Sequence, residues 1–82
     1  MVKVIFLNLL RSKYNIKEIE VKAGSIHDIL AQIQEIHPEV ELADFRNTVI
    51  FINTVRVIHE SKYSEPVNDG DEIVFTHFIG GG

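Results

Sequence analysis

A single amphipathic helix, predicted over residues 26–36, is the feature that most constrains the fold of this 82-residue chain. Ser25 followed by Asp28 three residues later is a variant of the capping box that begins helices. Pro38 disfavours helical backbone at the residue before it, so the helix should end at about His37. Between these signals, apolar residues recur at helical spacing and form one stripe: Ile26, Ile29, Leu30, Ile33 and Ile36. The apolar face of such a helix must pack against another layer of the protein.

Short segments rich in β-branched residues make up most of the remaining sequence. The predicted strands cover residues 2–10, 16–22, 48–52, 55–58 and 72–77. A polar turn at 11–15 joins the first two strands as a hairpin. The polar connection at 39–47 has room for one turn of helix, the segment 59–66 is a loop, and residues 67–71 carry a strong turn signal.

The order of these elements predicts a two-layer α+β fold, in which the one main helix packs across a mixed sheet. The first and last strands are the most apolar, so we expect them to lie side by side in the middle of the sheet. The residues expected to face the helix are Val4, Phe6, Ile73 and Phe75. The alternating row then forms an apolar patch on the open face of the sheet, made of Ile5, Leu7 and Val74 with Thr76 beside them. The alternative is that long loops cover this face.

Size and charge narrow the classes of function. A chain of 82 residues forms one domain with a small core, which favours a binding or carrier module over an enzyme with an active site of its own. There is no cysteine, and the net charge is −4 without any basic run, so we expect no disulfide framework and no nucleic-acid partner. No stretch approaches the roughly 20 apolar residues of a membrane span, and we expect a cytoplasmic protein.

The most unusual feature of the sequence is its end, Gly80-Gly81-Gly82. Glycine has the largest backbone freedom and no side chain, so three in a row after a strand should not pack. A carboxylate on such a thin stalk can pass through a narrow channel into the active site of another protein, where a Cβ atom would clash. The alternatives are a frayed terminus or an expression remnant.

Several motifs together resemble a known family. The strand at residues 2–7 leads to Leu10 and Arg11, Asn53 follows the 48–52 strand, and residues 67–75 lead towards a Gly-Gly end. These features are similar to those of the ubiquitin-like sulfur carriers, of which the molybdopterin synthase small subunit and the thiazole-synthesis carrier are the best known. The resemblance implies a β-grasp domain over residues 1–77 and a flexible tail over 78–82.

The resemblance also implies a chemistry and a set of partners. A ubiquitin-activating-like adenylyltransferase uses ATP to adenylate the terminal carboxylate, here that of Gly82, and a sulfur donor protein converts the adenylate to a thiocarboxylate. The tail that threads into partners is Gly81, Gly80, Ile79 and Phe78. The large catalytic subunit of molybdopterin synthase then receives the sulfur. The chain itself binds no cofactor, because the ATP belongs to the activating enzyme.

The surface on which these partners would dock is, by the same resemblance, the open sheet face with Ile5, Leu7, Val74 and Thr76. Arg11 is a further candidate for a partner contact, and its alternative is a plain surface position at the end of the hairpin. Other functions stay open. The activated carboxylate of Gly82 could serve thiazole synthesis, transfer-RNA thiolation or attachment to lysines, or the domain could be an interaction module with an inert tail.

The remaining candidate residues give little support for a metal site or for catalysis. His27, His37, His59 and His77 have no metal-ligand spacing, so we expect no metal site. Glu18 and Glu20 alternate on the polar face of a strand, where a solvated face is a simpler reading than an acid–base pair.

Overall fold

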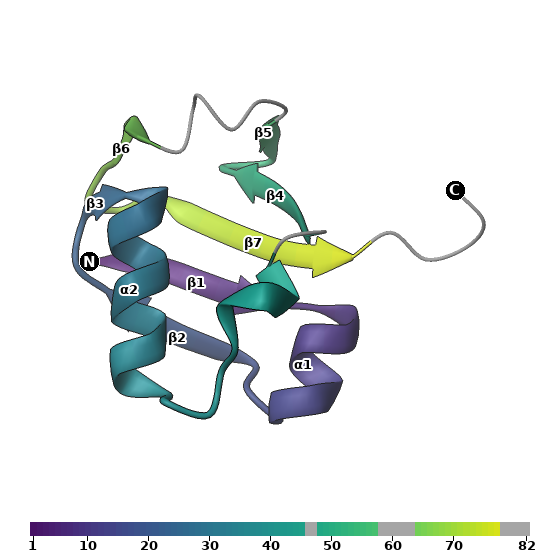
Figure 1. Cartoon of the computed structure of the whole chain (residues 1–82). Helices are drawn as coiled ribbons and strands as arrows, with labels where there is room; N and C mark the ends of the chain where they lie inside the picture. Colours follow the sequence, from purple (N-terminus) through teal and green to yellow (C-terminus); the bar gives the residue numbers. More distant parts are fainter. Residues whose placement is uncertain (46–47, 58–63, 78–82) are drawn as a thin grey trace.

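The computed structural model describes residues 1–45, 48–57 and 64–77 (Figure 1). In chain order the elements are β1 (Val2–Phe6), α1 (Asn8–Tyr14), β2 (Glu18–Val21), β3 (Gly24–Ser25), α2 (Ile26–Ile36), the 3-10 helix η1 (Leu42–Phe45), β4 (Thr48–Ile52), β5 (Val55–Val57), β6 (Pro66–Val67) and β7 (Glu72–His77).

The strands form a five-stranded mixed sheet in the order β2-β1-β7-β4-β5 and a small two-stranded sheet of β3 and β6. β1 and β7 run parallel in the interior of the main sheet, and the other neighbouring pairs are antiparallel. The prediction that the first and last strands are central neighbours is therefore confirmed. The physical reason is that these strands carry apolar residues on both faces, which a central position in a sheet protects from water.

α2 lies across one face of the sheet, as Figure 1 shows, and closes the core there. Val4, Phe6, Ile73 and Phe75 are all buried and belong to the same apolar cluster as Ile26, Ile29 and Ile33 of α2. The ring of Phe75 lies 6.1 Å from that of Phe6 and 5.1 Å from that of Phe45 between centroids. The residues predicted to face the helix are thus confirmed as core. This two-layer arrangement, with a helix packed across a mixed sheet, is the ubiquitin-like β-grasp fold.

The start and end of α2 agree with the sequence signals. The Ser25 side chain accepts a hydrogen bond from the backbone N–H of Asp28, and the Asp28 carboxylate accepts one from the backbone N–H of Ser25, each at 3.1 Å. The backbone N–H of His37 donates to the carbonyl oxygen of Ile33, which closes the last turn before Pro38. Local chemistry alone therefore delimits this helix.

The predicted strand over residues 2–10 is wrong beyond Phe6, and so is the turn at 11–15, because residues 8–14 form α1. Leu10 is buried in the core, and Tyr14, one helical turn further on, packs against that core from the same face of α1. α1 ends at Asn15, whose φ of 55° is the left-handed conformation of a helix C-cap. The helix is favoured over a continuation of β1 because it buries Leu10 at the end of the sheet. A longer strand would have no neighbouring segment there to cover the Leu10 side chain.

Two smaller differences concern strand ends. The strand predicted at 16–22 begins only at Glu18, and Ile16 is a core residue in the connection before it. In the segment predicted as loop, Pro66 pairs with Ser25 in the small sheet, and Val67 beside it is buried. Residues 58–63, which include the first five residues of that segment, lie outside the described residues.

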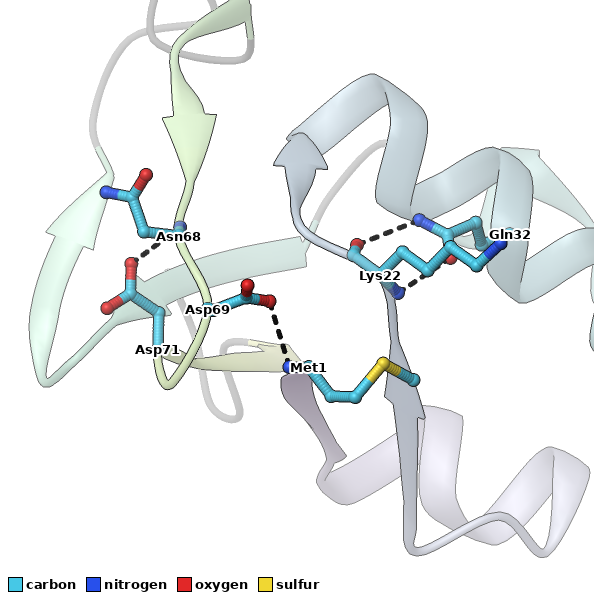
Figure 2. A network of polar contacts seen from close by, with 6 residues as sticks. All are labelled: Met1, Lys22, Gln32, Asn68, Asp69 and Asp71. Carbon is cyan, nitrogen blue, oxygen red and sulfur yellow. Dashed lines mark hydrogen bonds and ion pairs between the residues drawn. The ribbon is translucent and has the colours of Figure 1, made fainter.

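Polar contacts join α2 to the end of β2, and the N-terminus to the turn before β7 (Figure 2). Gln32 of α2 donates to the carbonyl oxygen of Lys22 at 3.0 Å and accepts from its N–H at 2.8 Å, which ties the end of β2 to the helix. The Met1 ammonium group pairs with Asp69 at 2.9 Å. None of the helices in the described part of the chain has the length and apolar composition of a membrane crossing.

Candidate functional site

The glycine tail lies outside the residues that the structure describes. The roles of Gly80, Gly81 and Gly82, and those of Ile79 and Phe78, therefore stay predictions, and so does the division into a domain at 1–77 and a tail at 78–82. The structure does describe β7, which leads to the tail and ends at His77. The candidate site therefore consists of the end of β7 and the sheet face beside it.

The root of the tail is held by the junction between β1 and α1. The backbone N–H of Leu7 donates to the carbonyl oxygen of Phe75 at 3.0 Å, which extends the β1–β7 ladder by one residue. The side-chain amide of Asn8 donates to the hydroxyl of Thr76. Asn8 has a φ of 56°, a left-handed conformation that asparagine tolerates better than most residues. No local sequence pattern marks Asn8 as part of this site, because its partner is 68 residues away.

The open face of the sheet carries the apolar patch at its centre. Ile5 lies directly opposite Val74, and Val74 lies directly opposite Phe51 on its other side. All three side chains are half-buried, and none belongs to the buried core cluster. Phe51 was not predicted as part of this patch, although the alternation within residues 48–52 already separates it from the core residue Ile50.

Of the residues predicted for a partner interface, four gather at this face and one does not. Ile5 and Val74 lie at its centre, and Thr76 lies two residues beyond Val74 on the same side of β7. Leu7, 37% exposed, has extended backbone, so it continues the alternation of β1 and lies on the side of Ile5. Arg11 lies on α1, where it is exposed, and is not part of the strands that form this face. Whether any of these residues contacts a partner remains a prediction.

Charged residues border the patch at both edges of the sheet. Glu18 of β2 lies opposite Ile5, and Arg56 of β5 lies opposite Phe51. A second row towards the start of β7 contains Glu20, Lys3 and Glu72, again directly opposite one another. Glu18 and Glu20 thus lie on a solvent-facing edge strand, as expected for a solvated face.

The turn before β7 is fixed by Asn53 and Asp71. The Asn53 amide donates to one carboxylate oxygen of Asp71 at 2.8 Å. The backbone N–H of Asn68 donates to the other oxygen at 2.9 Å (Figure 2). These two bonds hold the pKa of Asp71 below its usual value, and the bond from Asn53 has the larger effect. The Asn53 carbonyl oxygen also accepts from the N–H of Glu72 at 3.0 Å. One asparagine therefore links the β4–β5 turn to the start of the strand that carries the tail.

No metal centre is present in the parts of the chain that the structure describes, where no three His, Cys, Asp or Glu side chains are grouped to hold an ion.

The chain matches one protein-family model, and several solved structures share its fold. The model of the ThiS family matches residues 4–82. A search of curated protein sequences finds no match to this chain.

Solved structures with the same fold cover nearly the whole chain. The structure of the BexX/CysO complex from Amycolatopsis orientalis contains a chain with a TM-score of 0.82 and 21% identity, and the match covers 100% of both chains. Small archaeal modifier protein 1 from Methanosarcina acetivorans matches with a TM-score of 0.80 and 21% identity over 99% of this chain and 95% of that one. A chain in the complex of subunits 1 and 2 of molybdopterin-converting factor from Helicobacter pylori matches with a TM-score of 0.67 and 22% identity over 99% and 97%. At these identities the likeness establishes the fold alone.

Proposed function

Because this chain belongs to the ThiS family, we propose that it is a sulfur-carrier protein that bears sulfur on the carboxyl group of Gly82. The observation that carries the proposal is the family match, which runs to residue 82 and so includes the last three glycines. Glycine lacks a side chain, so this stalk can enter a channel that a Cβ atom would block. Gly81, Gly80, Ile79 and Phe78 form the segment that threads into the partner.

The proposed chemistry takes place in two steps on a partner enzyme, adenylation and then replacement of AMP by sulfur. The Gly82 carboxylate attacks the α-phosphorus of ATP, which forms an acyl-adenylate and releases pyrophosphate. Hydrosulfide then attacks the carbonyl carbon; the carbon–sulfur bond forms, the bond to AMP breaks, and AMP leaves with the electron pair. The adenylate is needed because a free carboxylate resists nucleophiles, whereas a mixed anhydride has a good leaving group. This chain contributes only the carboxyl group, and ATP is a substrate of the activating enzyme.

The partners that we propose follow from this chemistry. They are a ubiquitin-activating-like adenylyltransferase, a sulfur donor protein and, as the final recipient, the large catalytic subunit of molybdopterin synthase, all in the cytoplasm. The fold match to a chain in a molybdopterin-converting factor complex supports the last of these. Docking on the open face, through Ile5, Leu7, Val74 and Thr76, would leave the end of β7 free to direct the tail towards the partner, and Arg11 on α1 is a further candidate contact.

A second function uses the same activated carboxylate. The fold is shared with small archaeal modifier protein 1, which supports a role as a ubiquitin-like modifier joined to lysines. In that reaction a lysine amine replaces hydrosulfide as the attacking group, and an isopeptide bond forms as AMP leaves. Thiazole synthesis and transfer-RNA thiolation are other destinations for the sulfur.

The test is intact-protein mass spectrometry after incubation with the activating enzyme of the host, ATP and sulfide. We expect a mass increase that corresponds to one oxygen exchanged for sulfur, located at Gly82. A variant without Gly81 and Gly82 is the matched control and should show no change. An unchanged mass, with an enzyme shown to be active on another carrier, would contradict the proposal, and adducts on lysines in place of the thiocarboxylate would favour the modifier.

A further inference from the structure

The last residues of β7 are held from the β1 side by a side chain. The strand pairing of β1 with β7 ends where Phe6 lies opposite Phe75, and the backbone N–H of Leu7 adds one more bond, to the carbonyl oxygen of Phe75 at 3.0 Å. At the next residue of β7, the side-chain amide of Asn8 donates to the hydroxyl of Thr76. The Asn8 side chain therefore continues the attachment of β7 by one residue beyond the paired strands.

β4 holds the same residues from the other side. Its antiparallel pairing with β7 continues to the last residue of that strand, with Val49 opposite Thr76 and Thr48 opposite His77. The hydroxyl of Thr48 donates to the carbonyl oxygen of Phe45 at 2.6 Å, which fixes the start of β4 to η1. Thr76 thus lies between a paired strand and the start of α1, shortly before the predicted tail begins.

The position of Asn8 favours a geometric role for its bond to Thr76. Asn8 is the first residue of α1, and its φ of 56° is a conformation that most side chains avoid. Asn8 is exposed, and hydrogen bonds of exposed groups add little to stability, because water competes for the same donors and acceptors. The bond nevertheless joins residues that are 68 positions apart, near the point where β7 leads out of the sheet. Its main consequence is then the direction and order of the end of β7.

Order at this point matters for the chemistry proposed for Gly82. Six residues follow Thr76, and a fully extended chain of that length reaches about 20 Å. A change of about 10° in direction at Thr76 then moves the terminal carboxyl group by about 3.5 Å, which is as large as the distance at which reacting atoms must meet. Any residue of β7 that frays must also be ordered again when the tail enters a partner, at a cost in free energy.

We propose that the hydrogen bond between Asn8 and Thr76 is a latch that positions the tail for adenylation of Gly82. It keeps the last residues of β7 in the sheet, so that the tail enters the activating enzyme from a fixed direction and with fewer residues to order. Asn8 and Thr76 are positioning residues, because neither takes part in the attack of the carboxylate on ATP. The role in adenylation rests on the proposed function, whereas the order of β7 is a property of this chain alone.

NMR relaxation of the backbone amides in the full chain, without any enzyme, tests the latch itself. In the unmodified protein we expect order parameters of about 0.85 at Thr76 and His77, as in a rigid strand. Asn8→Gly, which retains the left-handed backbone, and Thr76→Val, which replaces the hydroxyl by a methyl group, should each lower the value at His77 to below about 0.6. Gln32→Ala is the matched control, because it removes two polar contacts to Lys22 at the end of β2 and should leave both values unchanged.

Adenylation by the activating enzyme of the host, measured as ATP–pyrophosphate exchange, tests the role in positioning. We expect Asn8→Gly and Thr76→Val each to lower kcat/KM by about fivefold, the effect of having to order about one further residue. The double variant Asn8→Gly/Thr76→Val should be no worse than either single variant, because both changes remove the same bond. Thr76→Ser keeps the hydroxyl and should recover most of the loss, and Gln32→Ala should react like the unmodified chain.

Order parameters that stay at about 0.85 in Asn8→Gly would overturn the latch. An unchanged kcat/KM in variants that have lost this order, or a Thr76→Ser variant as slow as Thr76→Val, would overturn the positioning role. Urea denaturation of each variant checks that the fold is intact. If the unmodified chain is not adenylated by an enzyme that is active on another carrier, the proposed function fails, and the relaxation measurement still decides whether the bond orders the end of β7.

Discussion

At the scale of single residues, two asparagines hold the strand that leads to the tail. Asn53 secures the start of β7 through Asp71 and Glu72, and Asn8 secures its end through Thr76. Both have positive φ, at 48° and 56°, where asparagine is favoured over most other side chains. Their side chains bridge segments that are distant in the sequence, so each combines a backbone role with a tertiary one.

The Asp71 carboxylate should make stability depend on pH. Its pKa in the folded protein is lowered by the bonds from Asn53 and Asn68, so its contribution is complete above the unfolded pKa of about 3.9. The contribution is lost as the pH falls through the folded pKa. We expect Asp71→Asn to reduce the free energy of unfolding at pH 7 and to reduce it less at pH 2.5, as measured by urea denaturation. An equal loss at both pH values would contradict this role.

The backbone and side-chain roles of Asn8 can be separated. Asn8→Gly keeps the left-handed backbone and loses the side-chain bond to Thr76, whereas Asn8→Ala loses that bond and also strains the backbone. We expect Asn8→Ala to be the less stable variant by about 1 kcal/mol in chemical denaturation. Thr76→Val removes the acceptor alone and serves as the control. Equal stability of the glycine and alanine variants would show that the backbone conformation is unimportant.

At the scale of elements, α1 is the segment that sequence patterns misassigned. Residues 8–14 continue an apolar run that began in a strand, and no capping side chain marks the start of the helix. α2 has a capping box, an apolar stripe and a proline stop, and it was predicted within one residue at each end. The difference is that α2 is specified by local interactions, whereas α1 is specified by the burial of Leu10 against the end of the sheet.

Truncation of Leu10 tests whether α1 is part of the core. Leu10 is 1% exposed, so Leu10→Ala should lower the free energy of unfolding by about 2–5 kcal/mol. Arg11→Ala, at the next and exposed position, should change it by less than about 0.5 kcal/mol. Thermal or urea denaturation measures both. A small effect of Leu10→Ala would mean that α1 is not packed as described.

At the scale of the whole molecule, the two faces of the sheet differ in burial. One face is covered by α2 and carries stability, and the other presents a half-buried apolar row between charged edges. The proposed function uses the second face for docking of an activating enzyme. Changes on this face should therefore affect association more than folding.

Leu7→Ala tests this expectation. Leu7 is 37% exposed beside the patch, so we expect about tenfold weaker binding to the activating enzyme and a loss of stability of only about 1 kcal/mol. Ile36→Ala, at an apolar position of α2 that is 50% exposed, is the control and should leave binding unchanged. Calorimetry measures binding, and urea denaturation measures stability. Comparable losses in both for Leu7→Ala would contradict docking on this face.

Features that depend on near neighbours could be predicted from the sequence alone. The caps and stripe of α2 lie within one segment, and the alternation along β1 and β7 separates Val4 and Phe75 from Ile5 and Val74 without knowledge of their partners. The apolar character of both strands also predicted that they are neighbours in the sheet.

Features that depend on pairing between distant segments could not be predicted in this way and become visible only in the folded chain. β4 lies beside β7, which adds Phe51 to the apolar row, and the register places Glu18 and Arg56 at its two ends. The bond from Asn8 to Thr76 and the helical conformation of α1 depend on the same assembled sheet. Periodicity is a local property of a chain, whereas strand order and register are set by which surfaces bury one another, and that is settled only when the whole chain is folded.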